Sequence, residues 1–218
     1  MLRVEEFESA LQRHVLDAWF PRCMDLTHGG FLCDFDRTWT SCGRHEKLLE
    51  FQARQTLTAA DACRRYPGDQ RFHDATLHGL RYLLEVMWDS ASGGWFHRLD
   101  RAGQPLEAYT KHAHGMAYAI QACVAVHDAT GNPAALPLAQ NGFDWLDRYA
   151  RDGDHGGYFG FLKRDGTVIR NPSECPWRSE TDTIGTEIGL KDANVHSDLL
   201  EALSHLYRVW PDPGSANG

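Results

Sequence analysis

The residues best suited to proton transfer lie in the most polar helix start of the chain, DANVHSDLLEAL at residues 192–203. Asn194 and Asp198 are four residues apart and share one face of a helix. His196 points elsewhere, about 160° from Asp198 if each residue turns about 100°. Histidine is the usual side chain for moving a proton near neutral pH. A structural interpretation stays open, because an Asp or Asn at a helix start is often a cap.

Arg54 is a second candidate, because it lies among apolar residues in the run FQARQTL. A guanidinium in such a setting must be paired or must face a solvated cavity. The alternative is a surface arginine whose aliphatic stem covers apolar neighbours.

His112 and His114 form a third group. Residues two apart on a helix do not face one another, so this is not a metal-binding pair. One of the two could line a polar opening near Tyr118. A capping role or a satisfied buried imidazole explains them equally well.

Aromatic residues gather near three glycine-rich segments, where they could stack on sugar rings or simply pack as strand residues. They are Trp39, Trp95, Tyr109, Tyr158 and Trp177.

Those glycine-rich segments are copies of one repeat, spaced about 64 residues apart. They read HGGFLCDFDRTW, SGGWFHRLDRAG and HGGYFGFLKRDG, with glycine pairs beginning at Gly29, Gly93 and Gly156. Each continues in alternating aromatic and polar residues, a pattern that predicts a short β-hairpin after a glycine bend.

A lysine follows each hairpin and opens an Ala- and Leu-rich helix. The lysines are Lys47, Lys111 and Lys191, and the helices are predicted over 47–66, 111–130 and 191–210. The middle helix is small and apolar almost all round, which is typical of a helix buried on most sides.

Helices with clear polar faces are predicted between these repeats, over residues 4–20, 71–88 and 133–150. The first places Val4, Phe7, Leu11 and Val15 on one stripe. Polar faces predict that these helices lie outside.

The alternation of outer helix, hairpin and inner helix predicts an all-α toroid of the (α/α)6-barrel type. Helix pairs that cannot bury their faces alone stack on their neighbours, and the hairpins gather at one mouth, where the inner helices point their positive ends. This chain provides about three of six pairs, a half barrel over residues 1–210. Residues 211–218 are predicted to be a frayed or truncated tail.

Composition excludes several classes of function. The net charge of −8 argues against a nucleic-acid partner. No apolar run approaches the ~20 residues of a membrane span, and the N-terminus does not read as a signal peptide. The six cysteines contain no CxxC pair, so we expect free thiols, a cytoplasmic setting and no zinc site.

Several segments together resemble the N-acylglucosamine 2-epimerase family, which includes cellobiose 2-epimerases and isomerases acting on mannose or sulfoquinovose. They are QAR at Gln52–Arg54, GGWFHRLDRAGQP at Gly93–Pro105, the helix from Lys111, and KDANVH with LLEAL within Lys191–Leu203.

The resemblance implies an (α/α)6 barrel that works without a metal or other cofactor on a small reducing sugar. A histidine would remove the proton at C2 to give an enediolate, which returns as the epimer or the ketose. Arg54 would stabilise the developing oxyanion. The resemblance also suggests Lys111, Trp95, His114, Tyr118 and Asn194 as substrate-binding residues.

Departures from the family leave the base open between His196 and Asp198. Many members carry a tyrosine where this chain has His114, and a catalytic histidine where it has Asp198. Two further catalytic histidines of the family lie in the second half of the barrel. We therefore expect a truncated or half-barrel form whose exposed inner helices favour self-association.

Two other functions stay open. One is a non-catalytic, carbohydrate-binding remnant of the same fold. The other is a glycoside hydrolase, which needs two carboxylates facing one cleft; Asp192 and Asp198 are present, without a convincing partner.

Overall fold

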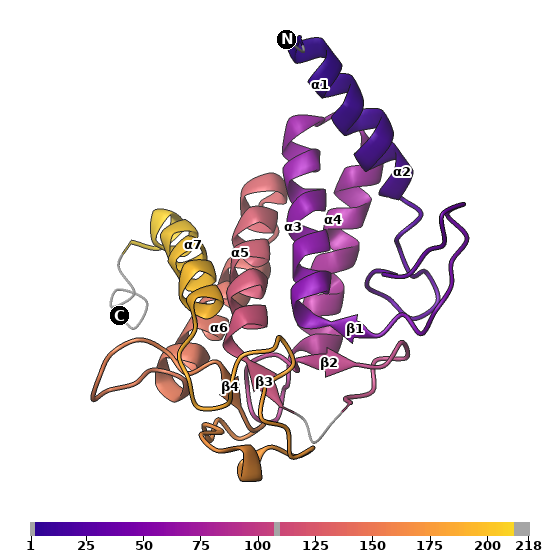
Figure 1. Cartoon of the computed structure of the whole chain (residues 1–218). Helices are drawn as coiled ribbons and strands as arrows, with labels where there is room; N and C mark the ends of the chain where they lie inside the picture. The colour runs from indigo at the N-terminus through magenta and orange to yellow at the C-terminus, as the bar shows by residue number, and fades with distance from the viewer. Residues whose placement is uncertain (1–2, 107–109, 212–218) are drawn as a thin grey trace.

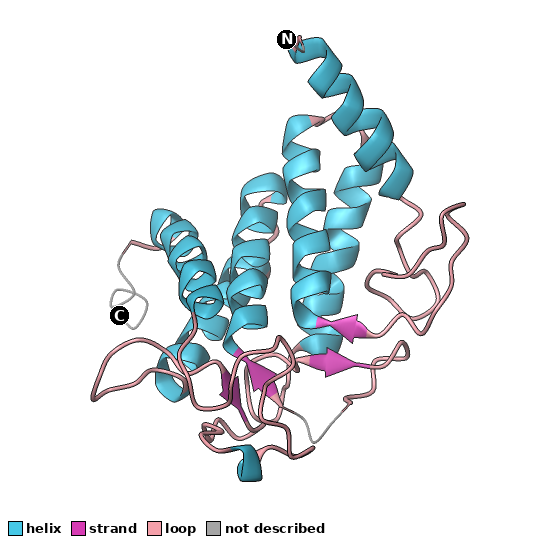
Figure 2. Cartoon of the chain, viewed as in Figure 1, coloured by secondary structure: helices cyan, strands magenta, loops and turns pink. Residues whose placement is uncertain are grey.

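The computed structural model describes residues 3–106 and 110–211. Tyr109 and residues 212–218 of the expected tail lie outside the described residues. Most of the described elements are helices, and the short strands lie at one end of the helix array (Figure 2).

Three outer helices were expected, and three are observed. The first comprises α1 (Val4–Ala10), a π-helical segment (Leu11–Leu16) and α2 (Asp17–Trp19). The second is α4 (Gln70–Tyr82), which continues in a π-helical segment (Leu83–Met87). The third is α6 (Ala135–Tyr149). The described residues leave the apolar stripe of the first helix largely exposed. Its four side chains, from Val4 to Val15, are 42–82% exposed.

The inner helices lie side by side in the order α3, α5, α7 (Figure 1). Their bounds are α3 (Leu49–Arg65), α5 (Ala113–Thr130) and α7 (Ala193–Val209). As predicted from its composition, α5 is buried on most sides and packs on α3, α7 and α6. Small residues permit this: a Cβ on Gly115 would lie 3.1 Å from the Leu49 side chain.

The repeat has a physical basis in a buried ion pair. Lys47 Nζ lies 3.1 Å from Asp25 Oδ2 and donates to the Phe31 carbonyl at 3.0 Å. The other carboxylate oxygen of Asp25 accepts the backbone N–H groups of residues 27 and 28. Each lysine thus ties the turn before its Gly-Gly pair to the start of an inner helix.

The same tie recurs in the other two units, between Lys111 and Asp89 at 3.1 Å and between Lys191 and Asp152 at 2.6 Å. Lys47 and Lys111 are fully buried, whereas the Lys191 side chain is 28% exposed.

The strands join neighbouring units instead of closing each hairpin, which corrects the simple hairpin prediction. β1 (Lys47–Leu48) pairs antiparallel with β2 (Arg98–Leu99), and β3 (Lys111–His112) pairs with β4 (Phe161–Leu162). Within a unit, the described residues form only isolated antiparallel bridges, such as Trp88 with Trp95.

Arginines reinforce this connection between units. Arg101 of the second unit donates to Asp25 of the first at 2.9 Å, and Arg164 of the third donates to Asp89 of the second at 2.7 Å. The glycine-rich segments therefore gather at one end of the inner helices, as the sequence predicted (Figure 1).

Two findings within the described ranges concern the cysteines and the length of the helices. All six cysteines are free thiols. None of the helices in the described part of the chain has the length and apolar character needed to cross a bilayer.

Candidate functional site

The candidate site is built from two helix positions that the repeat presents three times. The third and seventh residues after each lysine lie one turn apart on the same face of an inner helix. The third residues are Glu50, His114 and Asn194; the seventh residues are Arg54, Tyr118 and Asp198. The sequence analysis had singled out five of these six residues.

The central contact of the site joins α5 to α7. His114 Nδ1 lies 2.5 Å from Asp198 Oδ2, and the two side chains are 16% and 14% exposed. An ionised carboxylate only accepts hydrogen bonds, so Nδ1 donates and Nε2 of His114 is left to accept from a ligand. Asp198 therefore holds the imidazole in one tautomer.

Tyr118 and Arg54 continue the site toward α3. The Tyr118 ring meets the His114 ring edge-on, with centroids 5.3 Å apart. The guanidinium carbon of Arg54 lies 4.9 Å from the Tyr118 centroid, which is a cation–π contact. Burial raises the pKa of Tyr118, and the nearby Asp198 adds to this. Arg54 is exposed and brings its positive charge to this end of the site.

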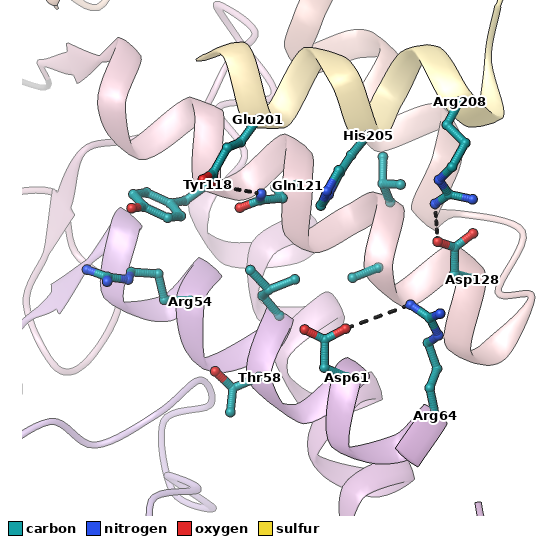
Figure 3. Close-up of a pocket in the computed structure, with 13 residues that line it drawn as sticks. Arg54, Thr58, Asp61, Arg64, Tyr118, Gln121, Asp128, Glu201, His205 and Arg208 are labelled. Carbon is teal, nitrogen blue, oxygen red and sulfur yellow. Dashed lines mark hydrogen bonds and ion pairs between the residues drawn. The ribbon is translucent and has the colours of Figure 1, made fainter. Parts of the chain in front are cut away.

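A groove of about 740 Å³ begins at Arg54 and Tyr118 and follows the inner helices away from the hairpins (Figure 3). Its middle carries Gln121, which donates to Glu201 at 3.2 Å. His114 and Asp198 do not line this groove but adjoin it through Tyr118.

Charged pairs mark the far end of the groove. Arg64 lies 3.8 Å from Asp61, and Arg208 bonds Asp128 across from α7 to α5 (Figure 3). These pairs were missed by the sequence reasoning. Continuing the helical period beyond the seventh position after each lysine reaches them.

Glu50 was also missed. It occupies the first turn of α3, is 5% exposed, and its Oε2 has no hydrogen-bond partner among the described residues. Burial raises the pKa of this carboxyl, opposed by the nearby His114, His112 and Arg54. Its equivalence to His114 in the repeat was the signal that could have identified it.

A buried network holds His114 from below. His112 Nδ1 accepts the backbone N–H of His114 at 3.2 Å, and His112 Nε2 lies 3.0 Å from Asp182 Oδ2. Burial opposes ionisation of Asp182, but its hydrogen bond with His112 lowers its pKa. Beside it, His97 Nε2 lies 2.6 Å from Thr183 Oγ1. The loop before α7 is thereby fixed over the start of α5.

His196 lies apart from this cluster. Its Nδ1 lies 2.7 Å from the carbonyl of Asp192, and its Nε2 accepts the backbone N–H of Tyr158 at 3.2 Å. The ring also covers Gly157, where a Cβ would approach Nε2 to 2.7 Å. Both nitrogens are thus engaged by backbone, which leaves Asp198 as the member of this pair that lies in the site.

Lys111 and Trp95 are placed in the core and not at an open surface. Both are 0% exposed, Lys111 in its ion pair and Trp95 donating from Nε1 to the Leu83 carbonyl at 3.0 Å. We assign both to the structure of the repeat. Asn194 is exposed in the first turn of α7.

The remaining aromatic candidates pack on neighbours. Trp39 contacts Trp19 edge-on. Tyr158 donates its hydroxyl to Asp147 at 2.9 Å. Trp177 packs against Phe161.

The chain is similar to known sugar-converting proteins along nearly its whole length. Residues 29–135 match the N-acylglucosamine 2-epimerase (GlcNAc 2-epimerase) family. Over 208 residues the chain is 29% identical to the cellobiose 2-epimerase of Bacteroides fragilis, covering 95% of this chain and 50% of that protein.

Solved structures agree with the sequence matches. The cellobiose 2-epimerase from Spirochaeta thermophila DSM 6192 superposes with a TM-score of 0.81 at 29% identity, covering 96% of this chain and 49% of that one. A D-mannose isomerase, 20% identical, shares the fold with a TM-score of 0.76, covering 97% of this chain and 49% of that one. The chain thus spans about half the length of the relatives it matches.

The three helix pairs correspond to half of an (α/α)6 barrel, as the sequence predicted. The family match, the curated relative and the shared architecture agree with the resemblance to the N-acylglucosamine 2-epimerase family.

Proposed function

We propose that this chain forms part of the active site of a carbohydrate epimerase or isomerase acting at C2 of a reducing sugar. The observation that supports this best is the His114–Asp198 pair at 2.5 Å, beside the Arg54–Tyr118 contact at the hairpin end of the groove. An oriented imidazole and a nearby guanidinium are the two groups that proton abstraction next to a carbonyl requires.

In the proposed reaction, His114 Nε2 accepts the proton from C2 of the open-chain sugar. The C–H electron pair forms the C1–C2 double bond, and the former carbonyl oxygen becomes the oxyanion of an enediolate. Arg54 stabilises that negative charge. Addition of a proton to C2 from the opposite face, by a donor other than His114, gives the epimer, and delivery of a proton to C1 gives the ketose.

His114 takes the role of the base here because of its geometry. His196 has both nitrogens in backbone hydrogen bonds. Asp198 accepts from His114 and orients it. The sequence had left the base between His196 and Asp198; we propose instead that Asp198 acts through His114.

The alternative is a protein that binds carbohydrate without converting it. The half-length match to the relatives favours considering it, because a groove lined from one side can hold a sugar without completing its chemistry.

Incubation in deuterated water separates the two functions. Mannose, N-acetylmannosamine and cellobiose are each incubated with the protein, and deuterium at C2 is followed by NMR together with sugar binding. Exchange that is lost in His114→Gln but kept in His28→Gln, an exposed histidine outside the site, supports the enediolate reaction. Binding without exchange supports the alternative. Neither binding nor exchange with any of the three sugars would refute both.

A further inference from the structure

The first glycine-rich segment gathers three metal-ligating side chains that the proposed reaction does not use. The Cys33 thiol, the Asp34 carboxylate and the His45 imidazole each offer a ligand atom, and these atoms all lie within 4.8 Å of one another. Cys33 Sγ lies 3.5 Å from Asp34 Oδ2, and His45 Nδ1 lies 4.0 Å from the same oxygen.

The backbone brings these side chains together. The segment folds back on itself, with a bridge between Phe35 and Ser41 and a hydrogen bond from the Cys42 N–H to the Asp34 carbonyl at 3.0 Å. His45 takes a left-handed conformation with φ of 51° and donates its own N–H to Asp34 Oδ2 at 3.3 Å.

Gly43 supplies the space for this cluster. Its φ is +80°, and a Cβ there would lie 2.8 Å from Asp34 Oδ2. The carboxylate therefore lies directly over a glycine whose conformation other residues rarely adopt. This closes the loop around His45, which is 2% exposed.

We propose that Cys33, Asp34 and His45 bind one Zn²⁺ ion. Thiolate, imidazole and carboxylate are the ligands of protein zinc sites, with zinc–ligand distances of about 2.0–2.3 Å. Tetrahedral geometry then separates ligand atoms by about 3.3–3.8 Å. The observed 3.5 and 4.0 Å require only a small approach of the side chains to one metal ion.

The second nitrogen of His45 has the partner that a metal-bound imidazole needs. Nε2 lies 2.8 Å from Ser41 Oγ. With Nδ1 on the metal, Nε2 carries the hydrogen and donates to this hydroxyl, which fixes the ring orientation.

The metal displaces only weak hydrogen bonds at Nδ1. Here the backbone N–H groups of Cys33 and Asp34 both approach that nitrogen at 3.3 Å. This is longer than the usual separation of about 2.9–3.0 Å.

The site belongs to the first repeat alone. The equivalent positions of the second repeat carry His97 and Arg98, and those of the third carry Gly160 and Phe161. The ligands come from both arms of a folded segment, with ten residues between Asp34 and His45. A search for CxxC pairs therefore does not reveal this group of residues. Zinc would tie these arms together beside β1.

Cobalt substitution tests the proposal on the whole chain. The reduced, metal-stripped protein is titrated with Co²⁺, which gives visible ligand-field bands in a tetrahedral site and a near-ultraviolet charge-transfer band when a thiolate binds. One Co²⁺ per chain with that band, displaced by one Zn²⁺, is expected.

Two variants and a matched control locate the ligands. Cys33→Ser should lose the charge-transfer band, and His45→Asn, which tolerates the left-handed conformation, should weaken binding by about 100-fold or more. Cys42→Ser removes an exposed thiol of the same segment and should leave the spectrum unchanged. Circular dichroism checks that each variant is folded.

The absence of a thiolate band in the unmodified protein would overturn the proposal without recourse to any variant. Retention of the band in Cys33→Ser, or its loss in Cys42→Ser alone, would also overturn it.

Discussion

At the scale of single residues, the three units differ in the side chain that each carries at the same position of the repeated backbone. The third position after the lysine carries a carboxylate in Glu50, an imidazole in His114 and an amide in Asn194. The backbone setting is the same in each unit, so the side chains alone decide the role. The proton-transfer group that we propose lies in the central unit, where His114 contacts Asp198 of the next helix.

The substitution Asp198→Asn tests the orienting role of this carboxylate. An amide cannot reproduce an ionised acceptor, so the His114 tautomer with Nδ1–H loses its stabilisation. We expect C2 exchange to fall by about 100-fold or more, as when the orienting carboxylate of a triad is lost. Ser197→Ala, an exposed neighbour on α7, is the control and should change the rate less than about twofold. Equal rates in Asp198→Asn and the unmodified chain would contradict the assignment.

Glu50 predicts an unusual dependence of stability on pH. Burial raises its pKa above the ordinary 4.5, so the folded chain keeps this proton where the unfolded chain has lost it. Below the unfolded pKa the carboxyl is neutral in both states and carries no ionic penalty. As the pH rises through the folded pKa, the unfavourable charge destabilises the fold.

Glu50→Gln should therefore raise the free energy of unfolding by about 1 kcal/mol at neutral pH and by almost nothing near pH 4. Urea denaturation at the two pH values measures the difference. A gain that is equal at both would show that burial of charge at Glu50 is not the cause.

Sequence reasoning located most of this site but could not orient it. Arg54, His114 and Asp198 were predicted because polar residues near an inner-helix start are conspicuous. Glu50 was overlooked because a glutamate in the first turn of a helix is normally a solvent-exposed residue that interacts with the helix dipole. His196 was kept beside Asp198 as a possible base, because local spacing does not reveal its hydrogen bond with the Tyr158 backbone across the fold.

At the scale of elements, the buried lysine–aspartate ion pairs hold each glycine-rich segment to its inner helix although the strands are short. The sequence predicted the inner helices because their apolar content is continuous over several turns. Strand pairing was predicted within each unit, but the observed strands are two residues long and pair between units. Segments that short carry no alternation from which a partner could be inferred.

Replacing Lys111 with methionine tests the tie. The substitution leaves Asp89 in the interior with Arg164 as its remaining side-chain partner, and loss of one member of a buried pair typically costs about 3–5 kcal/mol. Lys191→Met is a control at the equivalent repeat position, and because Lys191 is partly exposed we expect about 1 kcal/mol. Both are measured as changes in the free energy of unfolding. Equal costs would indicate that burial does not set the strength of the tie.

At the scale of the whole molecule, the last unit of the helix array differs from the two units before it. Asp25 and Asp89 each bind an arginine from the following unit, whereas the side-chain partners of Asp152 among the described residues are Lys191 and His155. The large apolar side chains that remain exposed include those of the first outer helix, from Val4 to Val15, at one end of the array, and Leu200 and Tyr207 on α7 at the other. In a toroid, such edges face further helix pairs.

We therefore predict that this chain self-associates through its edges. Leu200 and Tyr207 are 71% and 66% exposed, and they lie two turns apart on one face of α7, where burial of apolar side chains favours association in water. Sedimentation equilibrium should give a mass above the 24.6 kDa of one chain, rising with concentration. The double substitution Leu200→Glu with Tyr207→Glu should lower that mass toward one chain, because burying two carboxylates at the contact is unfavourable. Leu84→Glu, on the outer helix away from both edges, should leave the mass unchanged. A single-chain mass at every concentration would show that the edges are stable when open to water.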